Sequence, residues 1–277
     1  MKASDTSEGQ GELMDALSRE LQDALDYKDE VEMMLDANQM PCTATNIIAA
    51  HQVMYGTDGI YGMIRDMKNS LRKEGRETIT GKENQVLEQL ENKESVVYGM
   101  ENIRLSLSEE IHKKETDGTI TSMDIQALKY LNAGMPIAMR TVEEDVFQIP
   151  IVVDGEVNIM KVSILQDGSH AGEITATMDT PQYGKLEAGI HVGDNRVEGY
   201  IITEEENGQH LLEGSELTFR SAFAKLGLEV WDLRLDGTKP MQYGTSSGAS
   251  EIETSKLYKI AKQLLTAIKL TGIASDN

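Results

Sequence analysis

The sequence is poor in cysteine, in aromatic residues and in basic residues, and each shortage limits what the protein can be. Cys42 is the only cysteine among 277 residues, which excludes an intrachain disulfide framework. Aromatic residues make up only 5%, so aliphatic side chains and 15 methionines must fill the core. Lysine and arginine number 26 against 47 acidic residues, and the formal net charge is -21. A chain this acidic repels polyanions, so we expect neither nucleic acid nor an anionic membrane surface as a partner.

Long apolar runs and secretory signals are missing as well. The sequence contains no run of roughly 18 apolar residues, so we expect no insertion into a membrane. Its first residues, MKASDTSEGQGE, lack the apolar core of a signal peptide. These absences predict a cytoplasmic protein. Export by a route that needs no cleaved signal would leave the same pattern.

Motifs of the common enzyme classes do not occur. The chain has no P-loop, no glycine-rich dinucleotide fingerprint, no HExxH pair and no nucleophile elbow. Acidic residues are too numerous for any pair to stand out as a general acid and base. We therefore expect a protein that is not an enzyme, with no catalytic residues, no cofactor and no metal; an unrecognised catalytic site is the open alternative. The histidines show no ligand spacing; they are His51, His112, His170, His191 and His210.

One segment imitates a calcium-binding loop. In KKETDGTITSMD, residues 113–124, Gly118 falls at the sixth position of an EF-hand loop and Ile120 at the eighth. The first position is Lys113, where calcium needs a carboxylate oxygen, and the twelfth is Asp124 instead of a bidentate glutamate. We therefore predict a connection between two helices here, and not a calcium site.

The amino-terminal half has a helical period. From residue 12 to residue 145 apolar side chains recur at steps of three and four, beginning with a stripe from Leu13 to Leu35. Pro41 interrupts this pattern, and Pro136 is expected to bend or end the last helix. Helices that bury such stripes pack on one another in a bundle or an array. After the first stripe, the predicted helices cover about 43–56, 59–75, 82–114 and 121–140.

Near Val146 the period changes to two, which indicates β-strands. VFQIPIVVDGEVNIMKVSIL predicts a hairpin that turns at Asp154-Gly155. Three further strands, GEITATMDT, GKLEAGIHV and RVEGYIITE, are followed by a helical segment, 205–227, and by the strand LEVWDLRL. This order favours an antiparallel or mixed sheet that a helix covers on one face, which is an α+β fold.

The composition also predicts boundaries between these parts. A stretch rich in glycine, serine and threonine follows the last strand and reads as a linker. The final helix is amphipathic, with lysines on its polar side, and must dock on its own chain or on a partner. The predicted parts are a disordered segment 1–11, a helical domain 12–145, an α+β domain 146–236, a linker 237–250 and a carboxy-terminal helix 251–273.

The stretch MDTPQYGKLEAGIHV contains a corner between two strands. Pro181 ends the first strand because it cannot donate a ladder hydrogen bond, and Gly184 permits the backbone angle that leads into the next. With the helix and strand of LTFRSAFAKLGLEV, this pattern resembles the carboxy-terminal domain of the flagellar hook-length control protein family over residues 171–235. The family usually has Leu where this chain has Tyr183. The motif positions are Pro181, Gly184, Leu186, Phe219, Phe223, Gly227, Leu228 and Val230.

The resemblance implies a non-enzymatic protein of the flagellar export apparatus. Its α+β domain would contact the cytoplasmic domain of the export gate's switch protein, halting the export of hook subunits and permitting later, filament-type substrates. The motif positions would be structural and are also candidates for partner contact. Proteins of this family are themselves exported without a cleaved signal. The alternative is a structural adaptor unrelated to flagella, which self-associates through the long helix near 82–114.

Overall fold

The computed structural model describes residues 18–71, 86–87, 90–153, 156–167, 171–180, 182–239 and 252–272. Several predictions fall outside these residues. They are the disordered segment 1–11, the turn Asp154-Gly155, Pro181, and residues 240–250 of the predicted linker.

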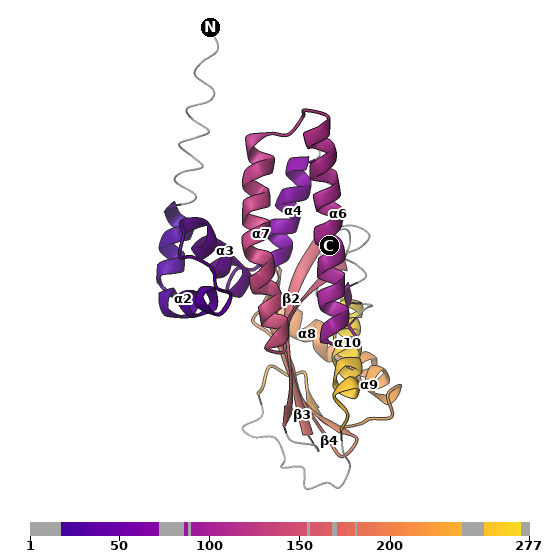
Figure 1. The fold of residues 1–277 in the computed structure, drawn as a ribbon. Coiled ribbons are helices and arrows are strands. Elements are labelled where there is room, and N and C mark those ends of the chain that lie inside the picture. The colour runs from indigo at the N-terminus through magenta and orange to yellow at the C-terminus, as the bar shows by residue number, and fades with distance from the viewer. Residues whose placement is uncertain are drawn as a thin grey trace.

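The amino-terminal half is an array of helices, in which α3, α4 and α7 make the most extensive contacts (Figure 1). Thr43 caps α3, and its side chain accepts a hydrogen bond from the backbone N of Asn46. Thr121 caps α7 in a capping box with Asp124. The helices are 18–25, α2 (Lys28–Ala37), α3 (Ala44–Met54), α4 (Gly59–Leu71), α6 (Lys93–Thr116) and α7 (Ser122–Glu143).

One predicted helix boundary was wrong, and another helix runs past its internal proline. The predicted helix 82–114 is divided, because Asn92 caps α6 and exchanges hydrogen bonds with Ser95 in a capping box, so α6 begins at Lys93. The helix expected to bend or end at Pro136 continues to Glu143. Its residues Ile137, Ala138 and Val142 are fully buried, and this packing outweighs the cost of about 3 kcal/mol for an internal proline.

The carboxy-terminal half is a six-stranded mixed sheet whose strands lie in chain order. Every neighbouring pair is antiparallel except β5 and β6, which are parallel because α8 and α9 connect them. The α+β prediction is confirmed. The strands are β1 (Val146–Val153), β2 (Glu156–Asp167), β3 (Ala171–Thr180), β4 (Gly184–Gly193), β5 (Arg196–Thr203) and β6 (Glu229–Arg234).

Local turn chemistry fixes the register of the β4–β5 hairpin. The turn GDNR joins β4 to β5, and Asp194 and Asn195 take φ angles of 51° and 60°. Two left-handed residues form the tight turn that suits the twist of a hairpin. Gly193 therefore pairs with Arg196, and the pairing continues to Leu186 with Thr203.

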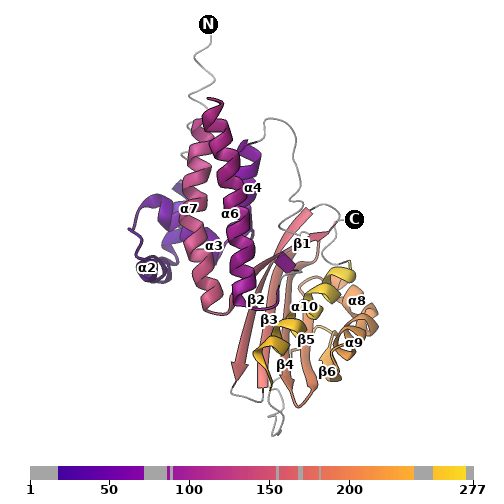
Figure 2. The same cartoon turned by 45° about the vertical axis from the view of Figure 1, so that its right-hand side comes forward.

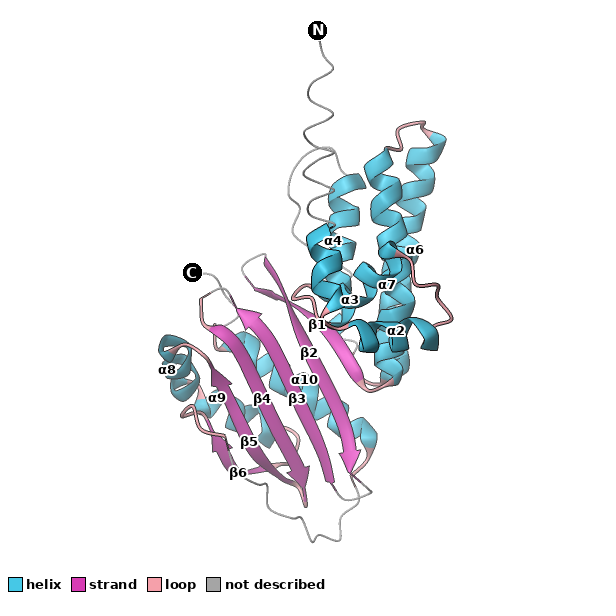
Figure 3. Ribbon diagram, turned by 90° about the vertical axis from the view of Figure 1, so that its left-hand side faces the viewer, coloured by secondary structure: helices cyan, strands magenta, loops and turns pink. Residues whose placement is uncertain are grey.

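One face of the sheet is apolar and covered by helices. The helices α8 (Glu206–Gly214), α9 (Glu216–Ala224) and α10 (Thr254–Leu270) all lie on this side (Figures 2 and 3). Across the strands, Val162, Ala176, Ala188 and Ile201 pair in one row and are buried. The predicted helical segment 205–227 is two helices that meet at Ser215.

The helical array joins the sheet at β1. Both α4 and α7 contact β1, and Lys93 of α6 forms an ion pair of 2.8 Å with Asp145, just before the first strand. Lys161 of β2 donates a hydrogen bond to the carbonyl O of Met54 at 3.1 Å. Buried apolar side chains form one continuous core through both halves.

Candidate functional site

The corner between β3 and β4 is held by side-chain bonds to the backbone. Thr180 Oγ1 donates to the carbonyl O of Gly184 at 2.7 Å and accepts from the backbone N of Tyr183 at 3.2 Å. Gly184 has a φ of 65°, and a Cβ placed there would lie 2.6 Å from Oε2 of Glu204. That carboxylate accepts a hydrogen bond from the backbone N of Lys185. The corner is therefore a structural joint between β3, β4 and the end of β5.

Of the other motif positions, Leu186 lies on β4, and the rest lie in α9, in β6 and in the turn between them. Phe219 and Phe223 are fully buried between α9 and the sheet, and Leu228 is 4% exposed. Gly227 has a φ of 71° and ends the helical segment, as the sequence predicts. Val230 is half-buried on β6.

Arg220 ties α9 to β6. Its Nη1 donates to the carbonyl O of Val230 at 3.2 Å, and its Nε bonds Glu216 at 2.6 Å. Together with the buried phenylalanines, this bond fixes the position of α9 over the sheet edge. The motif positions within the described residues are thus gathered mainly in the core, and they leave the outer side of α9 open.

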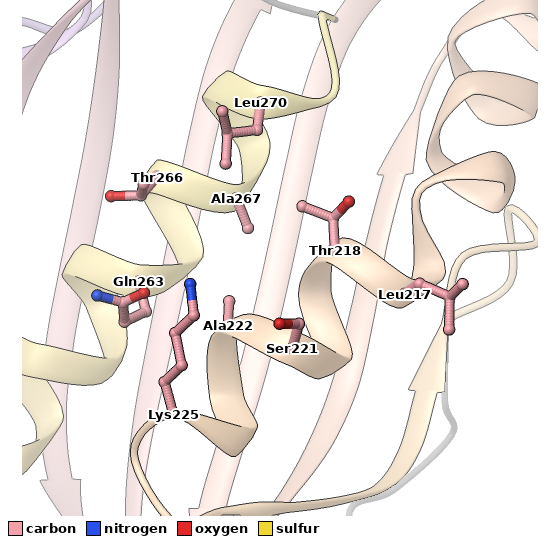
Figure 4. Close-up of a pocket in the computed structure, with 9 residues that line it drawn as sticks. All are labelled: Leu217, Thr218, Ser221, Ala222, Lys225, Gln263, Thr266, Ala267 and Leu270. Atoms are coloured by element: carbon pink, nitrogen blue, oxygen red, sulfur yellow. The ribbon is translucent and has the colours of Figure 1, made fainter.

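A groove runs between the outer sides of α9 and α10 (Figure 4). Its volume is about 350 Å³. Small residues, Ala222 and Ala267, line it where the helices approach, and two strongly exposed leucines lie at one end: Leu217 is 81% exposed and Leu270 is 71% exposed. The remaining lining residues are polar: Thr218, Ser221, Lys225, Gln263 and Thr266.

The face of the sheet opposite α8, α9 and α10 carries a polar cluster. Tyr200 Oη donates to Glu187 Oε1 at 2.6 Å, and Lys239 Nζ lies 2.8 Å from both carboxylate oxygens of Glu187. The hydrogen bonds from Lys239 and from Tyr200 lower the pKa of Glu187. Lys239, which follows β6, therefore reaches across β5 to hold a carboxylate on β4.

A second groove follows the outer edge of β6. Its volume is about 390 Å³, and Glu213, Glu216, Asp232 and Asp236 contribute to its walls. At one end of this edge Arg220 bonds the carbonyl O of Val230, and at the other Gln209 bonds that of Leu235. Occupied carbonyls make this edge a poor template for an added strand.

The segment that imitates a calcium loop connects α6 to α7, as predicted. Asp124 is fully buried and accepts hydrogen bonds from the backbone N and Oγ1 of Thr121 at 2.7 and 2.8 Å. Lys114 Nζ lies 3.1 and 3.2 Å from its two oxygens. The carboxylate that a cation would need is therefore used by the cap and by Lys114.

Neither a metal centre nor a membrane span emerges from the described residues. No group of three His, Cys, Asp or Glu side chains in this part of the chain is arranged to hold a metal ion. No helix among these residues is both long enough and apolar enough to cross a bilayer. No protein-family model, no curated protein and no solved structure matches the chain.

Neither the groove between α9 and α10 nor the Glu187 cluster was predicted from the sequence. The sequence predicts a helical segment that contains Leu217 and a last helix with lysines on its polar side, but it does not predict that these two helices pack together. The sequence contains part of the signal for an exposed leucine in the groove, because Leu217 falls outside the apolar stripe formed by Leu212, Phe219 and Phe223. The pairing of α9 with α10 is a tertiary contact, and no local pattern encodes it.

Proposed function

We propose that this chain is a non-enzymatic protein of the flagellar export apparatus, similar to hook-length control proteins. In this proposal its α+β part, residues 146–236, binds the cytoplasmic domain of the export gate's switch protein. Binding stops the export of hook subunits and permits that of later, filament-type substrates.

The observation that carries the proposal is the placement of the motif residues. Leu186, Phe219 and Phe223 are fully buried, and the order of elements, strand, corner, two strands, a helical segment made of two helices, and strand, follows the one on which the resemblance is based. Buried apolar positions maintain the shape of a binding domain. They supply no nucleophile, no general acid and no metal ligand, which favours a binding function over an enzymatic one.

The direct test is calorimetric titration of the purified chain with the purified cytoplasmic domain of the switch protein from the same genome. We expect saturable binding with a Kd on the order of tens of micromolar or tighter. No binding in that range would contradict the proposal. Flagellar genes beside the coding sequence would support it, and their absence would count against it.

A second candidate function is self-association through α6. Tyr98 and Leu105 are 66% and 49% exposed, and they lie one heptad apart on the same face of this helix. This alternative predicts a dimer in analytical ultracentrifugation that Tyr98→Asp with Leu105→Asp converts to a monomer. Under the flagellar proposal, the same double variant binds the switch protein domain with unchanged affinity.

A further inference from the structure

We infer that the groove between α9 and α10 binds an acidic amphipathic helix of a partner protein. The inference deepens the proposed function and rests on it in one respect, namely that the partner is a protein. The surface and the chemistry of its ligand follow from the two helices themselves.

The groove has a shape that suits a third helix. Along it, α9 and α10 run in opposite directions, so that Leu217 lies toward the Leu270 end and Lys225 lies toward Gln263 (Figure 4). Ala222 and Ala267 keep the floor shallow but open. Two packed helices with small residues between their outer faces form a groove into which the side-chain ridge of a third helix can pack.

Large apolar side chains are exposed at one end of the groove. Leu217 and Leu270 are among the most exposed large hydrophobic residues in the described part of the chain. They come from elements far apart in sequence, yet both contribute to the same groove. Covering both leucines would remove apolar surface from water at about 25 cal/mol per Å². An apolar side chain of the partner is therefore expected at this end.

The other end of the groove between α9 and α10 carries positive charge. Lys259 continues the stripe of Gln263, Thr266 and Leu270 by one helical turn, and Lys225 stands opposite Gln263 on α9. Both lysines are exposed, and neither forms an ion pair with another described residue. At the apolar end, the carboxylate of Glu216, next to Leu217, is bonded by Arg220 at 2.6 Å.

This charge is unusual for the molecule. The whole chain has a formal net charge of -21, whereas α10 contains lysines at 256, 259, 262 and 269 and no acidic residue. A basic helix on an acidic protein attracts a negatively charged ligand to one face and repels it elsewhere. The apolar end and the basic end together select a helix that carries leucine-like residues and, one to two turns away, carboxylates.

The test uses a synthetic, fluorescently labelled helical peptide of about four turns. It carries leucines four residues apart near one end and glutamates beyond them; a control peptide carries lysines in place of the glutamates. We expect the 277-residue chain to bind the acidic peptide with a Kd on the order of 100 µM or tighter. Equal binding of the lysine peptide would overturn the inference.

Two double variants locate the binding surface. Leu217→Asp with Leu270→Asp, and Lys225→Glu with Lys259→Glu, should each weaken acidic-peptide binding by at least about tenfold. All four side chains are exposed, so circular dichroism should remain that of the wild type. Lys28→Glu with Lys113→Glu makes the same charge change far from the groove and should leave binding unchanged beyond the general effect of charge. Retained affinity in both groove variants would overturn the inference, as would a wild-type dimer that these variants dissolve.

The groove variants also separate this inference from the proposed function. If the switch protein domain binds the wild type and both groove variants equally, and the acidic peptide does not bind through the groove, the proposed function stands and the groove assignment is wrong. If the acidic peptide binds through the groove and the switch protein domain does not bind, the groove assignment stands and the flagellar proposal is wrong.

Discussion

The side-chain amide of Gln148 on β1 accepts a hydrogen bond from the backbone N of Ile60, at the start of α4, at 2.8 Å. Its Nε2 also donates to the carbonyl O of Val53, near the end of α3, at 2.6 Å. Gln148 is 3% exposed. A single side chain of the sheet thus satisfies one free N–H at a helix start and one free C=O at a helix end, and it joins the two halves of the protein.

Replacing Gln148 by Leu should destabilise the protein by about 2–4 kcal/mol, because two buried backbone groups lose their partner. Urea denaturation measures this loss. Gln166→Leu is the matched control, since Gln166 also bridges two groups, the carbonyl O of Ile252 and the hydroxyl of Thr254. Gln166 is exposed, so water can replace its bonds, and its loss should cost less than about 1 kcal/mol. Equal costs for the two variants would contradict this account.

The sheet was predictable from sequence because its signals are local. Alternating apolar residues and the left-handed pair Asp194 and Asn195 fix both the strands and their register. The position of Gln148 was not predictable. In the sequence it is one polar residue in a strand, and its partners Ile60 and Val53 lie 88 and 95 residues away.

The same division holds for the candidate site. The motif residues Phe219 and Phe223 were predicted to lie in a helical segment, and both side chains are buried. The groove needs α10, whose docking on α9 depends on how both helices cover the sheet. A helix start was misjudged at Asn92, where a cap acts against the apolar period. At Pro136 packing outweighs the proline, and the helix does not end there.

Asp124 should be essential for stability because of its bonds to Thr121 and Lys114. Asp124→Ala removes the N3 carboxylate of the capping box, which accepts from Thr121, and leaves Lys114, whose side chain is only 15% exposed, without its carboxylate. We expect a loss of about 3–5 kcal/mol in thermal or urea denaturation. Asp117→Ala, in the same connection but exposed, should change stability by no more than about 0.5 kcal/mol. Calorimetric titration of the wild type with millimolar calcium should give no saturable heat; a clear saturable heat would reject this interpretation.

Alanine substitutions at two motif glycines distinguish the cost of backbone strain from the cost of a steric conflict. Gly184 and Gly227 have similar φ angles of 65° and 71°, so an alanine at either position pays the left-handed cost of about 1–2 kcal/mol. Only at Gly184 does the added Cβ meet another group, the side chain of Glu204, and no atom lies within 4 Å at Gly227. We expect Gly184→Ala to lower the free energy of unfolding by about 1 kcal/mol more than Gly227→Ala. If urea denaturation showed Gly227→Ala to be more destabilising than Gly184→Ala, the contact with Glu204 would not make the corner the more tightly packed of the two positions.

The Glu187 cluster should give the protein a measurable acid sensitivity. Hydrogen bonds from Lys239 and then from Tyr200 lower the pKa of Glu187 in the folded state. A depressed folded pKa means that the stabilising contribution is fully present above the unfolded value of about 4.3 and is lost as the pH falls through the folded value. Since the Glu187 side chain is 27% exposed, solvent screens the pair, and we expect the contribution to be about 0.5–1 kcal/mol.

Glu187→Gln isolates this contribution, because glutamine keeps the shape of the side chain but has no charge to lose. Between about pH 5 and pH 3, the free energy of unfolding should fall less steeply for this variant than for the wild type. Glu173→Gln removes a carboxylate from the same face of the sheet, one strand away from Glu187 and without a contact to Lys239, and its pH profile should run parallel to that of the wild type. Parallel profiles for all three proteins would mean that Lys239 does not hold Glu187 in solution. A flattened profile for Glu187→Gln alone would mean that it does, and that the segment after β6 is fastened across the open face of the sheet by a charged hydrogen bond.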